Sequence, residues 1–139
     1  MLQMLGPIIQ SINKGGEMYR DLTELESCLI EKMLASNFKG KEILLEQIYK
    51  SKVFLLQGYE FISLKFKTKE LKKYPFEVRV PVAMKIFQED VAPIICLLHV
   101  INGYIDELEI FIADFSRIDL TDVKLDKVEY DIDKEVEIC

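Results

Sequence analysis

The stretch IICLLHVI-NG-YIDELEIF, residues 94–111, decides the fold of this chain. Two runs rich in β-branched and other apolar residues flank Asn102-Gly103, and this dipeptide is the strongest short signal for a β-hairpin. Both residues tolerate a positive φ, which a type I′ turn requires at its two central positions. We therefore predict an antiparallel hairpin over residues 94–111 and place the other elements around it.

A two-residue loop determines which residues of the two strands face each other. With Ile101 opposite Tyr104, regular pairing places His99 opposite Asp106. The same count places Leu97–Leu108 and Ile95–Ile110 on that face, and Val100–Ile105, Leu98–Glu107, Cys96–Glu109 and Ile94–Phe111 on the other. Because residues 94–101 are apolar on both faces, we expect a central strand with a neighbour on each edge and cover on each side.

Helical patterns precede the strands. Thr23 and Glu26 match the capping box, in which a hydroxyl and a carboxylate each accept a free backbone N–H at the start of a helix. The buried stripe of this first helix is expected to be Leu25, Cys28, Leu29 and Met33, with Cys28 as an apolar filler. A second helix is predicted over residues 41–50, with Leu44, Leu45, Ile48 and Tyr49 on one side.

A period of two begins at Val53 and predicts strands over residues 53–56, 59–67 and 78–87. Pro81 lacks a ladder donor, so the third of these should be an edge strand or contain a bulge. Near the C-terminus apolar residues alternate with Glu129, Asp131, Asp133, Glu135 and Glu137, which predicts one or two strands with an outward row of carboxylates. The architecture is thus α+β: two N-terminal helices packed on an antiparallel, five- to six-stranded, largely meander sheet around the central 94–111 hairpin.

Composition narrows the classes of function. A net charge of −6 and a pI of about 4.9 argue against a nucleic-acid binder and suit a basic protein partner. Three cysteines and one histidine, at no metal-ligand spacing, predict no metal or cofactor site and a cytoplasmic location. No apolar run is long enough for a membrane span, so no membrane partner is expected. Residues 1–17 are interpreted as an N-terminal arm and residues 18–139 as a single domain.

A catalytic interpretation would rest on His99 and Asp106, because a carboxylate can orient an imidazole and raise its basicity. No Ser or Cys is placed beside this pair, since Cys96 lies on the opposite face of the strand. We therefore favour a cross-strand polar pair and predict no catalytic residue.

Two motifs resemble those of a widespread family of small bacterial α+β proteins of unassigned function. The first is RDLTxxE, residues 20–26, followed by a helix pair, and the second is LLHVxxGxIxELEI, residues 97–110. The resemblance covers roughly residues 18–118. It implies a link to immunity proteins, which protect bacteria against toxins delivered by contact, and it transfers no functional residue.

The preferred hypothesis is a binding protein that neutralises a basic partner, an immunity protein that blocks a toxin nuclease. Eight acidic residues against three lysines after Ile118 place a charge of −5 there, which would steer such a partner. The predicted partner-binding residues are Glu129, Tyr130, Asp131, Asp133, Glu135 and Glu137, with Tyr130 as an exposed aromatic anchor. The alternatives are a small structural or assembly domain that self-associates through an exposed strand, and a hydrolase using His99 and Asp106. The sequence leaves the oligomeric state open.

Overall fold

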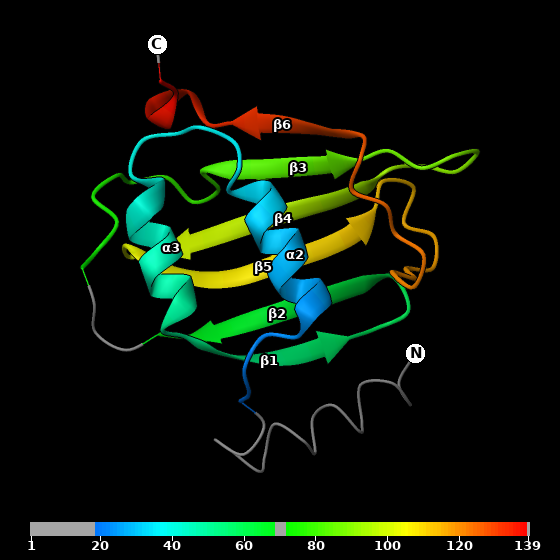
Figure 1. Cartoon of the computed structure of the whole chain (residues 1–139), viewed down its shortest axis with the longest axis horizontal. Coiled ribbons are helices and arrows are strands. Elements are labelled where there is room, and N and C mark those ends of the chain that lie inside the picture. Colours follow the sequence, from blue (N-terminus) through cyan, green and yellow to red (C-terminus); the bar gives the residue numbers. More distant parts are fainter. Residues whose placement is uncertain (1–18, 69–71, 139) are drawn as a thin grey trace.

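The computed structural model describes residues 19–68 and 72–138, so the predicted arm of residues 1–17 lies outside the described part. The elements are α2 (Glu24–Met33), α3 (Lys41–Tyr49), β1 (Lys52–Gln57), β2 (Phe61–Lys67), β3 (Val82–Ile86), β4 (Ile94–Ile101), β5 (Tyr104–Ile112), β6 (Val128–Ile132) and the 3₁₀-helix η2 (Lys134–Val136). The described strands form one six-stranded antiparallel sheet in the order β1-β2-β5-β4-β3-β6, and both helices lie on the same face of it (Figure 1). The predicted α+β fold is confirmed. Neither described helix has the length and apolar composition that crossing a bilayer would need.

The central hairpin forms at the predicted turn. Asn102 and Gly103 have φ values of 53° and 85°, as a type I′ turn requires. Ile101 faces Tyr104 and Val100 faces Ile105, both as predicted. Beyond these two pairs the register shifts by one residue, because Asp106 is an extra residue in β5 that faces no residue of β4.

This β-bulge makes the regular register beyond Val100 wrong. The observed pairs are His99–Glu107, Leu98–Leu108, Leu97–Glu109, Cys96–Ile110, Ile95–Phe111 and Ile94–Ile112. The reason is burial: Ile105 and Leu108 are both buried, yet side chains three residues apart on a regular strand point to opposite faces. The extra residue reverses the alternation, so both can enter the core.

Strand β4 lies between β5 and β3, so the predicted central position is confirmed. The predicted cover on both sides is wrong for one face. Ile94, Cys96, Leu98 and Val100 are buried beneath the helices, whereas Ile101 on the other face is 37% exposed. We call this other face, opposite α2 and α3, the distal face. It carries Phe61, Ser63, Lys65, Ala83, Lys85, Ile95, Leu97, His99, Ile101, Tyr104, Glu107, Glu109, Phe111, Glu129 and Asp131.

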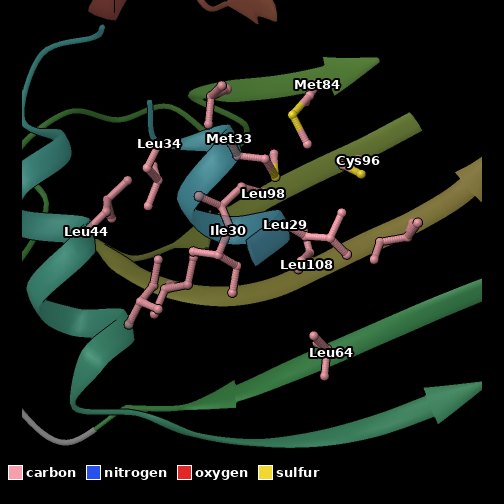
Figure 2. Packing of buried hydrophobic residues seen from close by; sticks show 14 of the residues in the cluster. Leu29, Ile30, Met33, Leu34, Leu44, Leu64, Met84, Cys96, Leu98 and Leu108 are labelled. Atoms are coloured by element: carbon pink, nitrogen blue, oxygen red, sulfur yellow. The ribbon is translucent and has the colours of Figure 1, made fainter. Parts of the chain in front are cut away.

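Helix α2 begins with the predicted capping box between Thr23 and Glu26. Its buried residues are Leu29, Ile30 and Met33, which pack over Leu98 and Leu108 of the sheet (Figure 2). Because Ile30 enters the core, the buried stripe is rotated from the predicted one. Leu25 is 39% exposed and Cys28 is exposed, so the predicted burial of both was wrong.

Helix α3 shows a similar rotation. Leu44 and Ile48 are buried as predicted, but Tyr49 is 67% exposed. Gln47, and not Tyr49, is fully buried on this helix. Its side-chain amide forms hydrogen bonds to the backbone of the central hairpin at Gly103 and Ile105.

Pro81 does not put its strand at an edge. Strand β3 begins at Val82, immediately after the proline, and lies between β4 and β6. A proline just before the first strand residue removes no ladder donor, and the Pro81 carbonyl still accepts from Asp133 N (3.1 Å). The sheet is a meander only in part, because β2 pairs with β5 and β6 returns to pair with β3.

Candidate partner-binding surface

The predicted partner-binding carboxylates lie along one edge of the molecule. Strand β6 is the outermost strand beside β3 (Figure 1), and Glu129 and Asp131 face Lys85 and Ala83 on the distal face. All five acidic side chains are exposed. We call this set the acidic edge: Glu129, Asp131, Asp133, Glu135 and Glu137.

The acidic edge is not one continuous strand, and of the one or two strands predicted here the structure forms one. Strand β6 ends at Ile132, and the Asp133 carboxylate then accepts from Glu135 N (2.9 Å), which caps η2. Val136 is fully buried and its carbonyl accepts from Lys39 N (2.8 Å) in the connection between the helices. An Asx turn and one anchored side chain therefore end the strand, and Glu135 and Glu137 lie on and just after a single helical turn.

Tyr130 points to the helix side of β6, so the expected exposed anchor is not found there. The residue faces Met84, is half-buried, and donates its hydroxyl to Lys32 O at 2.5 Å. Burial raises the pKa of its phenol above the ordinary value of 10.0. Tyr130 thus fastens β6 to the end of α2.

The carboxylates of the acidic edge belong to the described carboxylates that form no ion pair, a group that also includes Glu31, Glu60, Glu77 and Glu89. Within the described residues, Asp21, Glu26, Glu46, Asp106, Glu107 and Glu109 each pair with Lys, Arg or His. No carboxylate of the acidic edge forms an ion pair with another described residue. Their charges are therefore left to interact with solvent ions or with a partner.

His99 forms a polar cluster on the distal face, but not with Asp106. His99 Nε2 lies 2.8 Å from Glu109 Oε1, and Arg79 Nε donates to His99 Nδ1 at 3.2 Å. Asp106 instead pairs with Lys65 at 3.3 Å. The bulge explains why His99 pairs with Glu109 instead of Asp106, because it brings Glu107 and Glu109 onto the face that carries His99.

The hydrogen bonds of His99 define its tautomer. Since Nδ1 accepts from Arg79, the ring proton lies on Nε2 and is donated to Glu109. Both ring nitrogens thus have hydrogen-bond partners within the protein. Glu107 on the same face accepts from Ser63 Oγ at 2.5 Å. The arrangement acts as a cross-strand link between β4, β5 and β2.

The first motif that carries the family resemblance is also a structural unit. Arg20 forms two hydrogen bonds of 2.8 Å to the Glu26 carboxylate, and Thr23 N donates to the same carboxylate. Burial alone would raise the pKa of Glu26, but these hydrogen bonds outweigh it and hold the pKa below the ordinary 4.5. The motif therefore joins the start of α2 to the backbone pairing of Arg20 with Val53 on β1.

An aromatic pair at the end of β5 was missed by sequence reasoning. Phe115 stacks on Phe111 with ring centroids 5.7 Å apart, and Phe115 is 63% exposed. Its φ of 59° is a conformation that bulky residues rarely adopt and that costs about 1–3 kcal/mol. A local sequence signal for this turn is Asp114, whose carboxylate accepts a hydrogen bond from Ser116 N.

A groove of about 660 Å³ lies between α2, β1, β2 and the segment 117–123. Its lining is mixed, with Leu25 and Leu55, each 39% exposed, among its apolar residues and Arg117 among its polar residues. The sequence does not indicate this groove, because its shape depends on how α2 crosses the sheet. Among the described residues no group of three His, Cys, Asp or Glu side chains is arranged to hold a metal ion.

Comparison with known proteins identifies one family. The family model described as a domain of unknown function (DUF6984) matches residues 19–122, a range that contains both motifs. Searches of curated proteins and of solved structures found no match. The matched range ends before β6, so the acidic edge lies outside it.

Proposed function

Because the chain belongs to the DUF6984 family, whose description names no activity, we propose a function from its own surface: a binding protein that neutralises a basic partner. We further propose that it is an immunity protein and that the partner is a bacterial toxin nuclease. The observation that carries this proposal is the acidic edge, five exposed carboxylates without an ion pair to any other described residue.

The charge arrangement supports steering of a basic partner. Asp106, Glu107 and Glu109 on β5 each have a basic side chain as a partner, whereas the five carboxylates of the acidic edge have none among the described residues. A nuclease is basic around the site that holds phosphate, and such a site is complementary to this edge. Occupation of the site by the acidic edge would exclude nucleic acid without any chemical step.

An interface also needs an apolar anchor, and Phe115 is the better candidate than Tyr130. Its ring is exposed and stacks on Phe111. Buried aromatic anchors supply a large share of binding energy at protein interfaces.

The two alternatives have less support. Self-association through β6 would bring Glu129 and Asp131 near the same carboxylates of a second copy. The opposite edge at β1 is partly occupied, since Arg20 exchanges backbone hydrogen bonds with Val53 at 2.7 and 2.8 Å. The hydrolase alternative requires contact between His99 and Asp106. The structure does not show this contact, because His99 pairs with Glu109 and Asp106 pairs with Lys65.

The test uses toxin domains encoded beside the gene. Each is purified and mixed with the chain, and complex formation and residual nuclease activity are measured. We expect a stable complex in which nuclease activity is lost. If none of these domains is bound or inhibited, the immunity function is wrong.

A further inference from the structure

Strand β6 leaves one row of main-chain groups unused. Phe87 N donates to Lys127 O (2.9 Å), and Asp133 N donates to Pro81 O (3.1 Å). In an antiparallel ladder, residues that bond to the neighbouring strand alternate with residues whose N–H and C=O point away. The odd-numbered residues around β6 therefore bond to β3. The N–H and C=O groups that point outward belong to Val128, Tyr130 and Ile132, and none of them bonds to another described residue.

This free edge is held firmly in place. The side chains of Val128, Tyr130 and Ile132 pack against the hydrophobic core, and Tyr130 also bonds to Lys32 O. An edge that is already ordered loses little conformational entropy when another strand pairs with it. The main-chain groups are thus arranged to accept a strand without rearrangement.

The charges beside this edge select the occupant. Glu129 and Asp131 occupy alternate positions on the distal face, where a paired strand would place its own side chains opposite them. A second copy of β6 would bring like charges together, which discourages pairing. An extended segment with Lys or Arg at alternate positions would find an opposite charge at each site.

We propose that β6 binds an extended basic segment of a protein partner as a seventh strand of the sheet, with its cationic side chains facing Glu129 and Asp131. Main-chain hydrogen bonds would supply affinity, and the alternate carboxylates would supply specificity. This inference rests on the proposed function and names the segment of the partner that is recognised.

The test uses a capped seven-residue peptide of alternating valine and lysine as the probe, titrated into the isotopically labelled full chain at low ionic strength. We expect saturable binding, with amide exchange slowed at Val128, Tyr130 and Ile132. A peptide with glutamate in place of lysine should not bind. Replacing Glu129 with Gln and Asp131 with Asn should weaken binding by about tenfold.

A proline variant separates strand addition from simple charge attraction. Ile132→Pro removes an outward donor and no hydrogen bond to β3, so the sheet should be retained while peptide binding is lost. Ile132→Ala controls for the lost side chain and should still bind. The inference is overturned if the chain shows no saturable binding, if the three amides gain no protection, or if Ile132→Pro binds as well as Ile132→Ala.

The outcome is separable from the proposed function. A toxin that binds Ile132→Pro normally, yet fails to bind the Glu129→Gln/Asp131→Asn variant, would support neutralisation by charge and refute strand addition.

Discussion

The position of the central hairpin depends on one buried amide. Gln47 on α3 is fully buried, and its Nε2 donates to the carbonyls of Lys72 and Gly103, both at 2.9 Å. Its Oε1 accepts from Ile105 N at 2.8 Å. One side chain therefore joins the helix to the hairpin turn and to the segment that precedes β3.

Replacing Gln47 with Ala should lower the free energy of unfolding by about 4–6 kcal/mol. Each of the three hydrogen bonds contributes a net ~1 kcal/mol, and the Ile105 N–H, left buried without a partner, costs about 1–3 kcal/mol more. This is a large part of the ~5–15 kcal/mol typical of a domain. Urea unfolding followed by circular dichroism measures it, and the midpoint should fall by about 2–3 M for a slope of about 2 kcal/mol/M.

The control is Gln57→Ala on β1, where the side chain is exposed. This change should stay within about 0.5 kcal/mol. A loss below about 1 kcal/mol for Gln47→Ala, or one equal to that of Gln57→Ala, would refute the role given to the buried amide.

Three further predictions concern the cap, the turn and the thiols. Glu26→Gln should lower the free energy of unfolding by about 1 kcal/mol at neutral pH. Because the pKa of Glu26 is held below 4.5, this difference between the chain and its variant should vanish as pH falls below that value, and a difference that persists in acid would contradict it. Gly103→Ala should cost about 1–3 kcal/mol, because the φ of 85° is strained for Ala and the new Cβ would lie 3.0 Å from Lys73 Cβ; unchanged urea unfolding would oppose this. In a Cys139→Ser background, Ellman's reagent should modify the exposed Cys28 in the folded protein but should modify Cys96 only after unfolding. The reason is that Cys96 is buried, which also raises the pKa of its thiol to about 12. Equal rates of modification at the two thiols in the folded protein would contradict the burial of Cys96.

Features that depend on neighbouring residues could be read from the sequence. The Thr23–Glu26 cap and the Asn102–Gly103 turn are both local, and both formed as predicted. The Asp106 bulge also had a signal, since the apolar residues Ile105 and Leu108 are three apart. Regular alternation cannot bury both, so this spacing indicates a bulge once the hairpin is assumed.

Features that depend on distant residues were not predictable. The partners of Gln47 lie 25 to 58 residues away, so nothing near it indicates its burial. The inner position of β3 results from the return of β6, which no property of Pro81 reveals. For the candidate site, the exposure of the acidic edge was predicted, whereas its division at Asp133 and the inward direction of Tyr130 follow from packing against the helices.

The most direct measurement is the association rate between the chain and its toxin partner as a function of salt. The variant neutralises Glu129, Asp131, Glu135 and Glu137 and retains Asp133, because Asp133 caps η2. A control of equal net charge neutralises four exposed glutamates elsewhere, namely Glu31, Glu60, Glu77 and Glu89. We predict a rate that falls steeply with salt and, at low salt, drops by about tenfold or more in the acidic-edge variant and far less in the control. Equal rates for both variants, or a rate independent of salt, would contradict the account.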